Sequence, residues 1–580
     1  MADEEGRLPL SYPNPSLGQM ATPGGGSESS QTTKSARLGP KHPVQGARQV
    51  VLVISLLLGL LFSTLDTSII ATSLITISHE MQDFSNAPWI VLAYLLTYMG
   101  FAVWQSKLSD IYGRRNMIVI SWVIFIGFSL GCATAKDMIS LIVCRAFQGA
   151  GASGLYSLAQ IGLVEVGPVH RPSLVGAMIG ATLAVAFVLG PIIGGAVSHS
   201  SDWRWLFNMN IPFGLVAILA ISNLWPPEQV SSIFSWDAFS KIDFLGGGTL
   251  LLGSGLLVFA IQQAGSQTFA WGSPVIISTL VISGLSWIGF VIWEIRLQLT
   301  PSHRIEPIFP IKLMLHRVYS AGLLVTLLTG FPYIALSILI PERFQIINGE
   351  NVLMAGVHIL PLLGACAAGS FLGGAISSTR NNTSPTLVLA SCLQLLGTGL
   401  MMLVSSPDFS PESQYAFQAI FGLGVGLSFS AATIMTNIMA SEDHERASAQ
   451  GAVAQARVLG GCIGLSISTV IFNGYANRHL SHLSEEQLQA LHRSPLTGLQ
   501  ILDESDRELT RKAYGEAFSE QIKMMMLICA AMVVVSIFTL ERKPAPLERL
   551  TTYTKDHDQS PRGSDSVTEL NDLPSVRQSI

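Results

Sequence analysis

The feature that most constrains the fold of this chain is a succession of long apolar runs joined by short polar segments. A run of about 17–25 mostly apolar residues can cross the hydrocarbon layer of a membrane as a helix. Charged residues make up only 12% of the 580 residues, well below the ~25% typical of soluble domains. The sequence therefore predicts an all-α polytopic membrane protein with 14 transmembrane helices. They are expected at about residues 49–77, 87–107, 116–134, 138–163, 173–197, 205–225, 244–263, 274–293, 318–341, 353–378, 385–405, 412–438, 447–472 and 521–540.

Lysine and arginine are distributed unevenly between alternate joints, and this asymmetry predicts the orientation of the chain. The short loops on one side hold only Lys136, Arg204 and Arg343, whereas the side with both termini holds most of the other basic residues. We therefore expect both termini to be cytoplasmic and the protein to lie in the plasma membrane, with the vacuolar membrane as the alternative. The one long joint on the opposite side contains amphipathic stretches at 483–492 and 509–518, which predict short helices at the surface.

An internal repeat divides the chain into two halves. Ala146–Gln148 recurs 270 residues later as Ala416–Gln418, and Val188–Gly190 recurs at the same offset as Val458–Gly460. Repeated bundles with a binding site between them are typical of secondary transporters. The predicted domains are, in order, a disordered cytoplasmic tail (1–48), an N-terminal six-helix bundle (49–227), two linker transmembrane helices (228–300), a C-terminal six-helix bundle with an extracellular loop at 473–520 (301–541), and a second disordered cytoplasmic tail (542–580).

Two charged residues lie inside the apolar runs of the first half, Asp66 and Arg145. A guanidinium at the centre of a membrane helix costs about 2.5–3.5 kcal/mol on insertion scales. Arg145 is therefore expected to face a partner in the protein interior, with extension to the interface as the alternative. Burial favours the neutral form of Asp66, and a nearby cation favours its charged form. Asp66 is thus a candidate proton carrier, or else a packing residue hydrogen-bonded to Ser or Thr.

Three stretches of the first half resemble motifs of one known family. The joint Ser106–Arg115 resembles the signature loop of the major facilitator superfamily, although Ser106 stands where the family has glycine. Arg145–Gly151 resembles the arginine motif implicated there in proton coupling. Gly190–Gly195 resembles the antiporter motif of the exporters, with Ala186 in place of a further glycine. The resemblance implies a role in conformational gating for Asp110, Gly113, Arg114, Arg115, Gly190, Pro191, Gly194 and Gly195.

Further stretches narrow the resemblance. The segments 65–70, 203–212 and 241–246 are similar to the fourteen-spanner drug:proton antiporter family. The run 457–467 is similar to its fungal branch of toxin and multidrug efflux pumps. The resemblance implies the major facilitator fold, with two six-helix bundles and two inserted linker helices.

Aromatic and amide side chains within the runs predict the character of the substrate cavity. The residues expected to line it are Tyr98, Gln148, Tyr156, Gln418, Gln455 and Arg457. A cavity with few charges suits amphiphilic, largely neutral ligands. We expect proton-coupled efflux of a hydrophobic or amphiphilic small molecule, such as a secondary metabolite, mycotoxin or drug, by alternating access. The alternatives are proton-coupled uptake of an iron chelate, vacuolar transport of basic amino acids, and a transporter-like sensor that binds without translocating.

The sequence lacks the residue patterns of an enzyme. It holds no Walker loop, and its six cysteines lie in apolar stretches without CxxC spacing, so we expect them to be free and buried. No cofactor and no metal are predicted. The expected partners are a small-molecule substrate, protons and the lipid bilayer, with no nucleic acid, and the protein is expected to be a monomer.

Overall fold

The computed structural model of the chain consists of helices, and the residues that it describes form no strand. These are residues 46–166, 172–200, 202–226, 243–300, 305, 307–309, 311–377, 380–403, 412–440, 443–480, 482–541 and 544. The helices of the first half are α1 (Ala47–Met81), α2 (Pro88–Tyr112), α3 (Arg114–Thr134), α4 (Met138–Val166), α5 (Pro172–Ser200), α6 (Trp205–Asn208) and α7 (Asn210–Leu224). They are followed by α9 (Phe244–Gly265), α10 (Pro274–Leu299), α11 (Ile311–Met314), α12 (Arg317–Ile346), α13 (Val352–His358), α14 (Leu360–Ile376), α15 (Thr383–Leu403), α16 (Ser413–Met439), α17 (Asp443–His479), α18 (Glu485–Arg493), α19 (Pro495–Ile501) and α20 (Glu504–Ile537).

The described helices confirm an all-α membrane protein. Thirteen segments of the described chain are long and apolar enough to cross a membrane, each at one of the predicted positions. α2 occupies the remaining predicted position, with a shorter apolar stretch over Pro88–Ala102. Two of the predicted spans are interrupted: the sixth consists of α6 and α7, and the tenth of α13 and α14. The predicted tails lie outside the described residues except for 46–48 and 544.

The long joint before the last span differs from its prediction. The stretch 483–492 forms the predicted short helix, α18, which begins with a capping box between Ser484 and Gln487. The stretch 509–518, however, is not a separate surface helix. It is the first part of α20, which starts at Glu504 and continues into the membrane span. The prediction was wrong because the stretch contains no Pro before the apolar run and its single glycine, Gly515, is tolerated inside a helix, so one helix continues through both.

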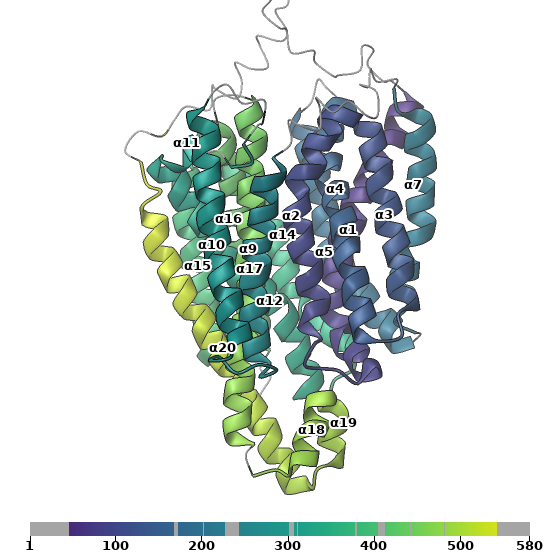
Figure 1. Ribbon diagram of the computed structural model, residues 1–580, viewed down its shortest axis with the longest axis vertical. Coiled ribbons are helices and arrows are strands. Elements are labelled where there is room, and N and C mark those ends of the chain that lie inside the picture. Colours follow the sequence, from purple (N-terminus) through teal and green to yellow (C-terminus); the bar gives the residue numbers. More distant parts are fainter. Residues whose placement is uncertain are drawn as a thin grey trace, which may run out of the picture. The chain divides into compact units, whose positions relative to one another are not determined.

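Two large apolar cores hold the helices together. One is built mainly from α1 to α7, around the fully buried Trp122, Phe125 and Phe207. The other is built mainly from α12 to α20, around Tyr319 and Phe421. Helices α9 and α10 pack chiefly on each other, and α9 also contacts α2 and α17. The purple-to-blue helices of the first core and the teal-to-yellow helices of the second can be followed in Figure 1.

The two ends of the helices are distinguished by what lies there. At one end, here called the tail end, α1 begins, and its first turn contacts the last residues of α4 and α7: Gln49 Nε2 donates to the Val166 carbonyl (3.0 Å), and Arg48 Nε to that of Leu224 (2.7 Å). At the opposite end, here called the loop end, α18 and α19 precede α20 (Figure 1). According to the predicted orientation, the tail end is cytoplasmic.

Candidate functional site

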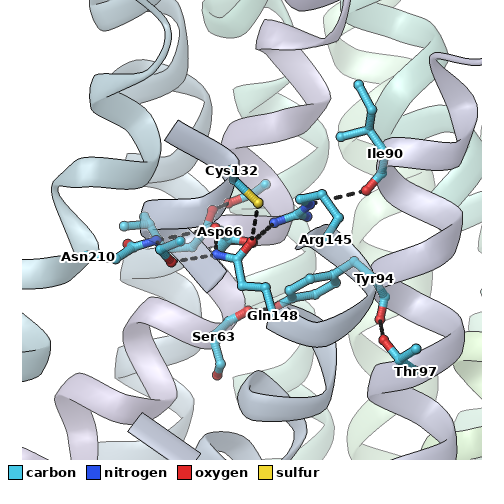
Figure 2. A network of polar contacts seen from close by, with 12 residues as sticks. Ser63, Asp66, Ile90, Tyr94, Thr97, Cys132, Arg145, Gln148 and Asn210 are labelled. Carbon is cyan, nitrogen blue, oxygen red and sulfur yellow. Dashed lines mark hydrogen bonds and ion pairs between the residues drawn. The ribbon is translucent and has the colours of Figure 1, made fainter. Parts of the chain in front are cut away.

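Asp66 of α1 and Arg145 of α4 form an ion pair inside the first core. Their side chains are only 3% and 1% exposed, respectively. Arg145 Nη1 donates to Asp66 Oδ2 and to Gln148 Oε1 (2.8 Å), and Arg145 Nε donates to the Ile90 carbonyl of α2 (3.1 Å). Figure 2 shows the guanidinium held between these acceptors. Arg145 therefore has the interior partner that its position predicted, and it does not extend to the interface.

The second carboxylate oxygen of Asp66 is also hydrogen-bonded. Gln148 Nε2 donates to Asp66 Oδ1 (3.0 Å) and to Ser129 Oγ (2.8 Å). Asn210 Nδ2 donates to the same two oxygens, at 3.5 and 3.1 Å (Figure 2). Asn210 is the first residue of α7, directly after the interruption that separates α6 from α7. Five helices, α1, α2, α3, α4 and α7, thus contribute to one buried network.

The network satisfies both charges of the Asp66–Arg145 pair within the protein. Ionised Asp66 accepts hydrogen bonds at both oxygens and neutralises the only guanidinium in the network. Protonation removes that charge and leaves Arg145 with carbonyl and amide acceptors alone. Because a buried charge is costly when it loses its partner, the pair holds α1 against α4 inside the first core. Both predicted roles of Asp66, proton carrier and hydrogen-bonded packing residue, stay predictions.

Tyr94 of α2 separates this network from a large cavity. Its ring lies against the guanidinium, with Arg145 Cζ 4.2 Å from the ring centroid. Its hydroxyl donates to the Ser63 carbonyl (2.9 Å), so the ring is fixed to α1 as well (Figure 2). The same residue lines the cavity, next to Tyr98, with 6.1 Å between the two ring centroids. One aromatic ring is therefore shared by the network and the cavity wall.

The cavity has a volume of about 740 Å³ and lies between the two cores. Its walls come from α1, α2, α4 and α5 on one side and from α12, α14, α16 and α17 on the other. Aromatic rings and aliphatic side chains dominate the lining, interspersed with Ser and Thr hydroxyls. Arg457 of α17 is the one charged residue among the described residues that line it.

Three of the six residues predicted to line the cavity do so: Tyr98, Tyr156 and Arg457. Gln148, Gln418 and Gln455 do not, which corrects their predicted placement. Gln148 belongs to the Asp66 network, and Gln418 is fully buried in α16. Gln455 faces α2, where its Nε2 donates to the Met99 carbonyl (3.3 Å). Helical spacing from Arg145 placed Gln148 on a common face, but the rest of its own bundle covers that face.

The predicted gating loop forms the turn between α2 and α3. Gly113 has φ 88°, in the left-handed region that favours glycine. Arg114 Nε pairs with Glu165 of α4 (3.1 Å), and its Nη1 donates to Ser109. Arg115 donates to the Ser222 carbonyl at the end of α7. The side chain of Asp110 lies outside the described part of the structure, so the loop is described through its glycine and arginines.

The predicted antiporter motif lies where α5 meets the second half of the chain. α5 packs against α1, to which it is tied by Ser68 Oγ donating to the Ala186 carbonyl (3.2 Å), and against α13 and α14. Gly190, Pro191 and Gly194 are buried in these contacts. Gly195 approaches the backbone of Leu353 so closely that a Cβ there would lie 2.6 Å from the Leu353 Cα. A side chain at this position would push α5 and α13 apart.

Several contacts join the two halves of the chain toward the loop end. Gln345 Nε2 of α12 donates to the Thr72 carbonyl of α1 (3.0 Å). The backbone amide of Phe84 donates to the Arg493 carbonyl (3.2 Å), and Thr497 Oγ1 lies 2.8 Å from His79 Nε2. Toward the tail end the cavity lining continues to Asn437, near the last turn of α16. The cavity lining thus continues toward the tail end, and these contacts between the halves lie toward the loop end.

The structure also contains a pair of acids to which the sequence analysis gave no role, although Asp243 lies in the segment 241–246. Asp243, the N-cap of α9, accepts from the Gly246 amide (2.7 Å) and from Trp293 Nε1 (2.8 Å). Burial raises the pKa of the Asp243 carboxyl. Glu294 of α10 accepts from the Ile308 amide (3.1 Å), in the segment that leads to the second bundle. No group of three or more metal-ligating side chains occurs in the described part of the chain.

Comparisons with known proteins identify the family. Residues 56–465 match the family model of the Major Facilitator Superfamily. The chain is 37% identical over 510 residues to the "MFS-type transporter FPY5" of Fusarium mangiferae, covering 86% of this chain and 85% of that protein. It is 24% identical over 510 residues to the "Efflux pump aflT" of Aspergillus parasiticus, covering 86% and 96%.

A solved structure of a bacterial homologue of the human lysosomal transporter Spinster shares the fold. That structure is in an inward-facing, unoccupied conformation, and its TM-score is 0.58 at 14% identity, covering 87% of this chain and 100% of that one. Fold, motifs and relatives agree on one assignment. The chain belongs to the major facilitator superfamily, in the branch that includes fungal efflux pumps, and it is a membrane transporter of small molecules and not an enzyme.

Proposed function

We propose that this protein exports a hydrophobic or amphiphilic small molecule, such as a secondary metabolite, mycotoxin or drug, in exchange for protons and by alternating access. The observation that carries the proposal is the shared wall between the cavity and the buried acid, formed by Tyr94. In this arrangement the proton site and the cargo site are separate, and both contact the Tyr94 ring. Relatives named as efflux pumps support the outward direction of transport.

The extent of the cavity fits the loading state of an exporter. With both termini in the cytoplasm, as the distribution of basic residues predicts, the tail end faces the cytoplasm. A cavity whose lining continues to Asn437, with Gln345 and Thr72 joined toward the loop end, would then receive cargo from inside. The plasma membrane is the proposed location, because export from the cell requires it.

The proposed proton step takes place at Asp66. A proton that arrives from the outer side neutralises the carboxylate, and Arg145 loses its ionic partner. The guanidinium then shifts relative to the Tyr94 ring, which also forms the cavity wall. Exchange requires that proton and cargo favour different states of the protein. In this scheme the protonated state disfavours bound cargo, and cargo release precedes return of the cavity to the cytoplasmic side.

The residues of the two family motifs are the proposed gates. Gly113, Arg114 and Arg115, with Asp110, would fasten α2 to α4 and α7 at the tail end. Gly190, Pro191, Gly194 and Gly195 would form the smooth surface on which α5 meets α13 at the loop end. In alternating access, the α5–α13 contacts at the loop end would break, and new contacts between the halves would form at the tail end.

Purified protein in liposomes tests the proposal. Two fluorescent probes with one ring system serve as cargo: 8-anilino-1-naphthalenesulfonate and its uncharged counterpart N-phenyl-1-naphthylamine. Antiport predicts that an acidic lumen drives accumulation of at least one probe, and that dissipating the gradient with a protonophore stops it. Asp66→Asn should abolish the gradient-driven part. Accumulation driven only by acid outside would instead establish symport and overturn export.

A further inference from the structure

Arg457 holds an exceptional position, because it is the one charged residue among the described residues of the cavity wall. It projects from α17, and its Cζ lies 3.8 Å from the centroid of the Phe429 ring of α16. The stacking fixes one face of the planar guanidinium. A guanidinium carries five N–H donors, and Arg457 is part of the wall that a cavity occupant would meet.

No carboxylate neutralises this arginine within the described part of the chain. The ion pairs there include Asp66 with Arg145 and Glu165 with Arg114, but none involves Arg457. Its Nε is buried and has no hydrogen-bond acceptor in the described structure. Stacking on an aromatic ring stabilises a cation only in part. An anion in the cavity would be the counter-ion that the described residues do not provide for Arg457.

Phenol hydroxyls belong to the same cavity wall. Tyr98 and Tyr156 of the first bundle and Tyr333 of the second line the cavity together with Arg457. Neutral phenols can donate hydrogen bonds to an anion, as a guanidinium does. A small anionic group beside Arg457 could therefore be bound from both bundles at once. The rest of the wall, including Phe187 and Leu363, is apolar and suits a hydrophobic body.

We propose that Arg457 binds the acidic head group of the cargo, so that the transported class is amphiphilic organic acids: an apolar body that carries one carboxylate, sulfonate or acidic enol. This inference rests on the proposed function, since it takes the cavity to be the transport site. It revises the expectation of a largely neutral ligand. A guanidinium does not release its proton under physiological conditions, so Arg457 is assigned to cargo and not to the proton.

Equilibrium binding of the two naphthalene probes to protein in nanodiscs, with empty nanodiscs subtracted, tests this proposal. The probes differ only in the sulfonate. Wild-type protein should bind the sulfonate probe about tenfold or more tightly than the uncharged one, the difference expected for a charge-assisted hydrogen bond. Arg457→Gln should remove that preference without weakening the uncharged probe, and Arg457→Lys should retain part of it. Thr433→Val, a neutral change in the same wall, serves as the control and should affect both probes alike.

The outcomes separate this inference from the proposed function. Equal binding of both probes by wild-type protein, binding of neither, or an equal loss of both in Arg457→Gln, would each overturn the acidic head-group site. If only the uncharged probe is bound and is also carried by the pH gradient, export stands and the acidic class falls. If the sulfonate probe binds through Arg457 but no gradient moves it, the head-group site stands and proton-driven export falls.

Discussion

Arg145 and Arg457 are two arginines of the membrane-spanning region with opposite surroundings. Arg145 has a carboxylate, an amide and a carbonyl as acceptors, and an aromatic ring on one face. Arg457 also has an aromatic ring, that of Phe429, but no carboxylate among the described residues. An arginine side chain thus has an anionic partner within the protein in one bundle, and none among the described residues in the other. This difference supports the two proposals, in which Arg145 pairs with the proposed proton site and Arg457 binds the cargo.

The strongest test of this contrast is Arg145→Gln. The variant leaves the Asp66 carboxylate buried without its cation, and breaking a buried pair from one side costs about 3–5 kcal/mol. We expect a marked fall in the melting temperature and loss of gradient-driven transport. The double variant Asp66→Asn with Arg145→Gln replaces both charges and should regain most of the stability, but not the transport. If Arg145→Gln alone were as stable as wild type, the Asp66–Arg145 pair would not stabilise the fold.

Arg457→Gln should have a smaller effect on stability, because it leaves no carboxylate behind. The loss is limited to the contact with Phe429, about 0.5–2 kcal/mol for a cation–aromatic pair, and it is offset by relief of the unpaired charge. Thermal unfolding of both glutamine variants in the same detergent measures the difference. If Arg457→Gln unfolded as readily as Arg145→Gln, Arg457 would have an internal partner and the contrast would disappear.

Tyr94→Phe tests whether the wall between the two sites transmits the proton step. The substitution keeps the ring over Arg145 and removes only the hydroxyl bond to the Ser63 carbonyl, worth about 0.5–1.5 kcal/mol. Transport should persist with its pH dependence unchanged. Tyr94→Leu removes the ring and should alter both the pH dependence of transport and the affinity for the sulfonate probe. Equal behaviour of the two variants would remove Tyr94 from the coupling path.

The smallest expected effect comes from the linker helices, where Asp243 provides an independent source of pH sensitivity. Because burial raises the pKa of Asp243 in the folded state, the unfolded chain loses this proton first as pH rises. The contribution to stability is therefore present below the ordinary aspartate pKa and is lost as pH rises through the raised value. Asp243→Asn keeps the helix cap and should flatten this fall in a series of melting temperatures from pH 4 to 8.

Asp137 is the matched control of opposite sign. Its pKa is lowered by hydrogen bonds from the Ser140 amide and hydroxyl. The contribution of Asp137 to stability is present above the ordinary aspartate pKa and disappears as pH falls through the lowered value.

The Asp243 variant also tests the proton step. If Asp243→Asn changed the pH dependence of transport, the assignment of the proton step to the Asp66 network alone would fail.

Most of the fold could be predicted from the sequence, because the length and apolarity of a membrane helix are properties of a single segment. The predicted positions all correspond to helices, including the interrupted spans. The error at 509–518 has a local cause: amphipathic and apolar stretches can follow each other in one helix, as in α20. The point at which a surface helix becomes a membrane span depends on the membrane boundary. The composition of the sequence locates that boundary only coarsely.

The site was only partly predictable, since it depends on which faces meet. The sequence indicated a partner for Arg145 but not which one, and it gave no reason to select Asn210 or Ser129. The Trp203–Pro212 stretch that contains Asn210 was recognised only by resemblance. Gln418 and Gln455 were assigned to the cavity because they are polar residues in apolar helices. Such residues also occur inside a bundle. Periodicity alone does not distinguish a helix face that meets neighbouring helices from one that lines a cavity.

The Tyr94 ring has a consequence for how such a protein can diversify. Because the acid network lies behind this ring and contributes none of its own polar side chains to the described cavity wall, substitutions in the wall are expected to change cargo selectivity without altering the proposed proton site. Selection can thus act on Phe187, Tyr333 or Phe429 while Asp66, Gln148 and Asn210 remain fixed. Related chains should therefore be able to keep the Asp66 network unchanged while they come to transport chemically different molecules.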